Sequence, residues 1–184
     1  MQLTGSFSVL GERLDAVTDR EWTARAIPGS NLVGFILWHA ARTIDWGLHC
    51  TIRGMPEIAD QPAWRRLLSS EAMFDAGLSA AAADQVAQSV SRDDVRAYLD
   101  AVRRPALEWL SAVSDRELDQ IPDFEARQRD HGYRGPAVWE EISDLAGRPA
   151  WWILARPCIA HVRVHAGEVD ALRQVIRSSQ TTAR

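Results

Sequence analysis

Apolar side chains recur at steps of three and four positions along most of this chain, whereas few segments alternate with a period of two. Steps of three and four place side chains on one face of an α-helix, so the pattern favours an all-α protein. The first such run contains Phe7, Leu10, Leu14 and Val17. It predicts a first helix from about Ser6 to Ala24.

The second predicted helix carries the clearest apolar stripe. It follows a break at Pro28 and Gly29, Ser30 is a suitable N-cap, and Gly54 with Pro56 is a typical ending. Its stripe consists of Leu32, Phe35, Ile36, His39, Thr43, Trp46 and Cys50. A histidine therefore lies midway along an otherwise apolar helical face.

The helical pattern weakens between residues 55 and 91. The segment from Asp60 to Pro62 is suited to begin a short helix that carries Trp64, Leu67 and Leu68, and the alanine-rich segment 79–90 is suited to another. This region predicts a long crossover that contains short accessory helices.

Two serine-based start signals follow the crossover. Ser91 with Asp94 resembles a capping box and precedes a third long helix, in which Pro105 predicts a kink. Ser114 with Glu117 repeats the signal and predicts a short helix that ends near residue 122. The polar segment 123–136 is then expected to be mostly loop, with a strand-like stretch over residues 124–126, and a short helix is expected over residues 137–145.

A last long helix is predicted from Ala150 to Arg177, with Pro149 well placed at its first turn. Residues 178–184 are polar and predict a frayed, disordered tail. The inward stripe of this helix is Leu154, Cys158, His161, His165, Glu168, Leu172 and Val175. Four long helices with one long crossover after the second predict a four-helix bundle, and the 184 residues are expected to form one domain, 1–184.

The composition of the chain disfavours some classes of partner and some cellular compartments. The net charge of −4 argues against nucleic-acid binding, and no apolar run approaches the length of a membrane span. The first residues lack the basic-then-apolar pattern of a signal peptide. Cys50 and Cys158 are too few for a disulfide framework, so we expect free thiols in a cytoplasmic protein.

Three histidines are the strongest candidates for chemistry. His161 and His165 are four residues apart, so their side chains share one face of the last helix, and His39 lies on another helix. Two imidazoles from one helix and a third from a facing helix suit a divalent metal such as zinc. The alternative is a hydrogen-bonded pair in the core. Val162 stands where zinc proteases need a glutamate, which disfavours peptide hydrolysis of that type.

Several other side chains are weaker candidates around such a site. Glu168 and, less favourably, Asp45 are acids that could orient a metal-binding imidazole, although Asp45 is almost two turns from His39 and faces away from it. Cys158 precedes His161 by one turn, as a fourth ligand or a small core residue.

The remaining candidates have several readings. Cys50 is too far along its helix from His39 to be a co-ligand, and its neighbour His49 has no assigned role. His131 is expected to be solvated in a polar loop, which could also cover the mouth of a site. Arg42 suits an anionic substrate or a surface salt bridge. The tryptophans best placed to line a pocket are Trp38, Trp46, Trp151 and Trp152.

Two segments resemble the DinB/YfiT-like superfamily. Residues 30–46, SNLVGFILWHAARTIDW, are similar to its second helix, and residues 161–173, HVRVHAGEVDALR, are similar to the H-x-x-x-H-x-G-E motif of its last helix. The resemblance implies an up-down-down-up four-helix bundle. It also implies a zinc or nickel site formed by His39, His161 and His165. Some members are thiol S-transferases or isomerases that use mycothiol, bacillithiol or glutathione.

Two classes of function remain open. The first is a metal-dependent thiol transferase or isomerase, in which the metal activates a small thiol towards an electrophilic substrate. Every basic residue is Arg, a composition typical of actinobacteria, which favours mycothiol as the thiol. The second is a non-catalytic bundle that binds a small ligand or acts as a homodimeric scaffold.

Overall fold

The computed structural model describes residues 2–67, 76–133 and 135–182, and within these ranges the chain is all helical, without strands. The first half contains α1 (Gln2–Ala16), α2 (Asp19–Trp22), α3 (Val33–Asp45), the π-helix η1 (Trp46–Ile52), the 3₁₀ turns η2 (Ile58–Asp60) and η3 (Arg65–Leu67), and α4 (Ala80–Ser89). The second half contains α5 (Arg92–Ala112), α6 (Asp115–Leu118), α7 (Phe124–Asp130), α8 (Pro136–Ile142), the 3₁₀ turn η4 (Ser143–Leu145), α9 (Ala150–Ala155), the π-helix η5 (Arg156–His161) and α10 (Val162–Thr182).

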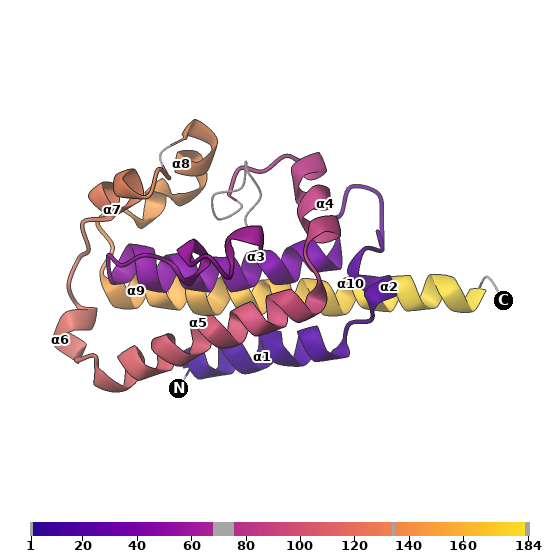
Figure 1. Cartoon of the computed structure of the whole chain (residues 1–184), viewed down its shortest axis with the longest axis horizontal. Coiled ribbons are helices and arrows are strands. Elements are labelled where there is room, and N and C mark those ends of the chain that lie inside the picture. Colours follow the sequence, from indigo (N-terminus) through magenta and orange to yellow (C-terminus); the bar gives the residue numbers. More distant parts are fainter. Residues whose placement is uncertain (1, 68–75, 134, 183–184) are drawn as a thin grey trace.

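The long helices lie side by side (Figure 1). Helix α3 packs against α1, α5 and α10, and α1 also packs against α5 and α10. In Figure 1, α1 and α10 run from left to right, whereas α3 and α5 run from right to left. Helix α4 packs against α3 on one flank, and α7 and α8 lie near one end.

Helix α3 and its continuation η1 form the centre of the core. From Val33 to Ile52 every residue except His39 is buried. A helix that is surrounded on all sides needs apolar side chains on all sides, and this segment has them. The second helix of the sequence analysis is thus confirmed, but its N-cap is Leu32, and Ser30 instead forms a turn through a hydrogen bond from its hydroxyl to the Ile27 carbonyl.

The last predicted helix contains a π-helical segment, η5, between α9 and α10. Pro157 lies in this segment and has no N–H to donate to the preceding turn, so the widened turn accommodates it. A π-turn displaces the following residues by about one position relative to α-helical spacing. The buried face of α10 is therefore Val162, Ala166, Val169, Leu172 and Ile176.

The expected first helix is wrong at both ends. Helix α1 begins at Gln2 and ends at Ala16, and the separate short helix α2 follows. Thr18 starts α2 as an N-cap, because its hydroxyl accepts from the Glu21 N–H while the Glu21 carboxylate accepts from the Thr18 N–H. Such a capping box favours a new helix start over continuation of the old one.

Residues 124–130 form a helix in place of the expected loop with a strand-like stretch. Helix α7 starts at Asp123, whose carboxylate accepts a hydrogen bond from the Ala126 N–H. Its apolar residue Phe124 is buried in a small second cluster of apolar side chains, which also supports the helix. The members of this cluster are Trp46, Cys50, Phe124, Tyr133, Ile142 and Leu145.

Other expected elements are confirmed or adjusted. The starts at Ser91 and Ser114 are confirmed, with each hydroxyl accepting a backbone N–H, and α5 continues through Pro105. The helix expected from Asp60 is instead a pair of 3₁₀ turns, and Leu68 lies outside the described residues. The expected frayed tail is wrong as far as Thr182, where α10 ends. No helix in the described ranges is long and apolar enough to cross a membrane.

Gly34 permits a close contact between α2 and α3, and its replacement by alanine tests this packing. A Cβ at Gly34 would lie 2.5 Å from Cε2 of Trp22, whose indole N–H is held by the Ala87 and Val90 carbonyls. Because the ring cannot shift freely, we expect Gly34→Ala to lower the free energy of unfolding by about 1–2 kcal/mol, after the gain in helix propensity. Urea unfolding measures this change.

Gly167→Ala is the matched control for Gly34→Ala. Gly167 lies in α10 and an added Cβ would meet nothing within 4 Å. Alanine there is expected to stabilise the protein by about 0.5–1 kcal/mol. Equal effects at the two positions would contradict the packing described for Trp22.

Candidate metal centre

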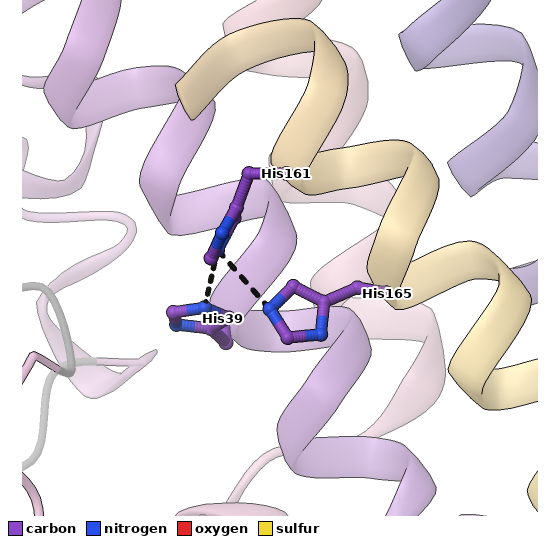
Figure 2. Close-up of side chains that lie close together, drawn as sticks. All are labelled: His39, His161 and His165. Carbon is purple, nitrogen blue, oxygen red and sulfur yellow. Dashed lines mark hydrogen bonds between the residues drawn. The ribbon is translucent and has the colours of Figure 1, made fainter. Parts of the chain in front are cut away.

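The three histidines singled out from the sequence meet between α3 and the last helix (Figure 2). His39 Nε2 lies 2.7 Å from His161 Nε2, and His165 Nε2 lies 3.1 Å from the same atom. The ligand atoms of all three residues are within 4.8 Å of one another. Figure 2 shows the rings of His161 and His165, from the last helix, converging on His39 of α3.

The helices fix the directions of the rings. His39 stacks on Phe35, one turn earlier in α3, with ring centroids 5.9 Å apart and planes 17° apart. Its ring meets those of His161 and His165 edge-on. The contact between α3 and α10 therefore supplies the third imidazole, as the sequence pattern predicts.

Glu168 holds the outer nitrogen of His165. Its Oε2 lies 2.8 Å from His165 Nδ1. A carboxylate there accepts a proton-bearing Nδ1–H, which leaves the lone pair on Nε2 directed at the other two histidines. The role expected for Glu168, an acid beside a candidate ligand, thus fits the geometry.

Hydrogen bonds between the three imidazoles cannot satisfy all three Nε2 atoms. The contact with Glu168 leaves His165 Nε2 as an acceptor, and His161 Nε2 carries at most one hydrogen atom. That single hydrogen cannot point well at both His39 and His165. A divalent cation accepts all three lone pairs. Ligand nitrogens about 2.0–2.1 Å from a tetrahedral ion are about 3.3 Å apart, so the rings need to spread only slightly to fit it.

Burial keeps the imidazoles of His39 and His161 neutral. Desolvation lowers the pKa of His39 well below its usual value, and the neighbouring His161 and His165 lower it further. Desolvation, with His165 and Arg156 nearby, lowers the pKa of His161 to about 4. A neutral imidazole has a free lone pair, so at neutral pH His39 and His161 are in the form that binds metals.

The same shift predicts acid sensitivity in the metal-free protein. His161 titrates near 6.5 in an unfolded chain and near 4 when folded, so between these values the unfolded state binds more protons. Stability is therefore lost as pH falls from about 6.5 towards 4. Because the ring is partly exposed, we expect a loss of about 1 kcal/mol between pH 6.5 and 5.

Urea unfolding of chelator-treated protein at the two pH values measures this loss. His161→Gln removes the titrating group and serves as the control. The variant should lose about 1 kcal/mol less than the wild type over the same pH interval. An equal loss in both proteins would show that His161 does not contribute.

The histidines border two cavities. One cavity, of about 470 Å³, lies beside His39 and His161, and its wall combines apolar side chains with two charged ones, Arg156 and Glu141. The apolar part of the wall comes from Trp46, Ala76, Ile142, Leu145, Pro157, Ala160 and Val164. A second cavity, of about 310 Å³, lies beside His39 and His165 and shares Glu141 with the first. A ligand in either space would lie next to the imidazoles.

His161 and His165 lie at the edge of the buried face of the last helix, not inside its apolar stripe as expected. Both residues are half-buried, while Val162 and Ala166 beside them are buried. The π-helical segment before them shifts the stripe by one position. This displacement turns the imidazoles towards the cavities.

Asp45 and Arg42 of α3 lie in a buried polar network away from the histidine cluster. The less favoured orienting role for Asp45 and the surface salt bridge for Arg42 are therefore wrong, whereas Asp45 faces away from His39 as expected. The Arg42 guanidinium is 2.8 Å from a Glu57 oxygen and 3.0 Å from the Tyr98 hydroxyl. His49 Nδ1 lies 2.8 Å from Asp45 Oδ1 in the same network.

The cysteines do not join the histidine cluster. Cys158 is fully buried, with its Sγ close to the space above Gly47, and burial raises the pKa of its thiol to about 12. Of its two readings, the small core residue is therefore correct. Cys50 is distant from His39, as expected, and lies near Glu57 and His131. His131 is half-buried and does not cover the histidine site.

Of the four tryptophans expected to line a pocket, Trp46 lines the cavity beside His161. Trp38 is enclosed in the core, Trp151 is exposed, and Trp152 lies under the guanidinium groups of Arg148 and Arg156. The cavity residues Glu141 and Arg156 were not found from the sequence. Neither forms part of a spaced motif, so no sequence signal distinguishes them from surface charges.

Comparison with known proteins agrees with the resemblance of the two histidine segments. The sequence profile of the DinB superfamily matches residues 2–169, which includes all three histidines. Searches of curated proteins and of solved structures give no match.

Proposed function

Because this chain belongs to the DinB superfamily, we propose that His39, His161 and His165 bind one divalent metal, zinc or nickel, and that the protein is a thiol S-transferase or isomerase. One observation carries the proposal: three imidazole Nε2 atoms converge, and two of these imidazoles, His39 and His161, border a cavity of about 470 Å³. Three neutral imidazoles that leave coordination positions open are typical of catalytic zinc sites.

The fold belongs to the same proposal. We infer one domain, 1–184, in which α1, α3, α5 and the last helix form the up-down-down-up four-helix bundle of the superfamily. The helix directions in Figure 1 support this topology. The buried free thiols of Cys50 and Cys158 support a reducing, cytoplasmic setting.

The residues around the cavity suit a small thiol and an electrophile. A divalent metal at the histidines would lower the pKa of a thiol that binds there. Arg156 and Glu141 bring opposite charges to the same space, and Arg156 also pairs with Asp144, so the metal would be the main source of positive charge for an anionic thiolate. Trp46 and Ile142 offer apolar surface to the electrophilic substrate and limit the access of water. The arginine-only basic composition favours mycothiol as the thiol.

In this reaction the thiol loses its proton to solvent water, and the thiolate electron pair forms a bond to an electrophilic carbon. In a transfer the leaving group departs with its own electron pair. In an isomerisation the thiol is later eliminated and regenerated. While they serve as ligands, the histidines would exchange no proton with the substrate, because Nε2 would be bound to the metal and the outer N–H is turned away, as in the contact of His165 Nδ1 with Glu168.

An activity assay that follows both the thiol and the electrophile tests the proposal. Zinc- or nickel-loaded protein is mixed with mycothiol, bacillithiol or glutathione and a set of electrophiles, and free thiol and remaining electrophile are both followed with time, since a transferase consumes the thiol and an isomerase regenerates it. We expect metal-dependent and thiol-dependent conversion of at least one electrophile, and a loss of about 100-fold or more in His39→Ala. Metal-bound protein without thiol dependence across the set would favour the alternative, a non-catalytic ligand-binding or dimeric bundle.

A further inference from the structure

A second group of metal-binding side chains lies at the other end of η1 from the histidine cluster. Its members are Cys50 of η1, Glu57 just before η2, and His131 at the end of α7. Their ligand atoms all lie within 4.8 Å of one another, and Cys50 and Glu57 are buried. We propose that Cys50, Glu57 and His131 bind a second zinc ion, which fastens α7 to η1.

The donor set matches the preferences of zinc. A thiolate, an imidazole and a carboxylate are the three kinds of protein ligand that Zn²⁺ accepts, and mixed sets are common in tetrahedral sites. Ligands about 2.0–2.3 Å from a tetrahedral ion are about 3.3–3.7 Å apart. The separations here are at most 4.8 Å, so side-chain movements of about 1 Å close the site around one ion. A water completes the fourth position.

Gln128 prepares the sulfur for coordination. The Trp46 indole N–H, which can only donate, lies 2.8 Å from Gln128 Oε1 and so fixes the orientation of the amide. The amide nitrogen then faces Cys50 Sγ at 3.9 Å and Thr51 Oγ1 at 3.1 Å. A buried N–H donor at a sulfur stabilises a coordinated thiolate, which is the usual role of groups behind metal ligands.

Tyr133 orients both other ligands. Its ring stacks on His131, with centroids 5.9 Å apart and planes 18° apart, and its hydroxyl donates to Glu57 Oε1 at 2.6 Å. The other oxygen of Glu57 is held by Arg42 at 2.8 Å. A carboxylate oxygen has two lone pairs, so Oε1 can accept from Tyr133 and bind a cation at once.

Charge balance favours a cation at this place. The buried carboxylates of Asp45 and Glu57 face the guanidinium of Arg42, so these three groups together carry one uncompensated negative charge. Binding of Zn²⁺ with release of the Cys50 thiol proton to solvent adds one positive charge. The buried group then becomes neutral, and burial costs least when charges compensate each other.

Cobalt binding tests the site separately from the histidine cluster. Untagged protein is stripped with a chelator and titrated with cobalt(II), and the near-ultraviolet thiolate-to-cobalt charge-transfer band is recorded. The histidine cluster has no thiolate, so this band reports the second site alone. We expect the band in the wild type and in His39→Ala, saturating at one equivalent for this site.

Variants decide whether the sulfur belongs to Cys50. We expect Cys50→Ser to lose the band, whereas Cys158→Ser, which replaces the other buried thiol, should keep it. We expect His131→Ala to lose the band or to weaken cobalt binding by about tenfold or more. If Cys50→Ser does not fold, as judged by circular dichroism, His131→Ala alone decides. No band in the wild type, or a band unchanged in His131→Ala or in folded Cys50→Ser, would overturn the proposal.

Discussion

Replacement of Arg42 by leucine is expected to lower the free energy of unfolding by about 3–5 kcal/mol. Arg42 is 1% exposed, and its guanidinium contacts the Glu57 carboxylate and the Tyr98 hydroxyl. Leucine fills part of the volume but leaves the buried Glu57 and Asp45 without their positive partner. The cost of an uncompensated buried charge dominates the change, and it exceeds the cost of the lost packing. Urea unfolding followed by circular dichroism measures it.

Arg13→Leu is the matched control, because it removes an arginine from an ion pair at the surface rather than in the core. Arg13 lies 2.7 Å from Asp170 at the surface, where solvent screens the pair, so we expect a loss of at most about 1 kcal/mol. The double variant Arg42→Leu with Glu57→Leu should be less destabilised than the sum of the two single changes, because it removes both charges. A loss below about 1 kcal/mol in Arg42→Leu would contradict the buried network.

Replacement of His39 by alanine is expected to weaken zinc binding by more than about 100-fold. His39 is the only one of the three histidines that comes from α3, so its loss leaves two ligands on a single helix. The affinity is measured by competition with a chromophoric chelator in a Cys50→Ser background, which removes the thiolate site from the titration. Circular dichroism of the variant shows whether the fold is retained.

Two glutamate replacements give zinc affinities with which that of His39→Ala is compared. Glu168→Gln weakens the hold on His165 Nδ1 without removing a ligand, so we expect a smaller loss of about 10–100-fold. Glu108→Gln changes an exposed carboxylate on α5 and should leave the affinity unchanged. Equal affinities for zinc in Glu168→Gln and Glu108→Gln would show that the carboxylate beside His165 does not orient it.

The sequence predicts the helical fold and the histidine cluster because both depend on regular spacing. The runs around His39 and His165 follow helical periodicity, and the profile match over residues 2–169 confirms the family. Periodicity fails where the helix itself is irregular. Pro157 widens the last helix into a π-turn, which moves the buried stripe from His161 to Val162 and brings the histidines to the cavity wall.

The remaining differences come from contacts between residues distant in the sequence. The sequence alone suggests a surface position for Arg42, because no nearby residue indicates that Glu57 and Tyr98 surround it in the fold. The sequence of α7 suggests a loop, because most of its residues are charged or polar and only Phe124 packs into the second apolar cluster. The group around Cys50 needs partners 7 and 81 positions away, Glu57 and His131, which no local pattern connects.

The metal content of untagged protein, measured by inductively coupled plasma mass spectrometry for the wild type and His39→Ala, tests the central claim most directly. The three-histidine site predicts that the wild type holds about one equivalent of zinc or nickel more than the variant, whether or not a second site is filled. Less than about a tenth of an equivalent in the wild type, or equal contents in the two proteins, would contradict a metal held by His39, His161 and His165.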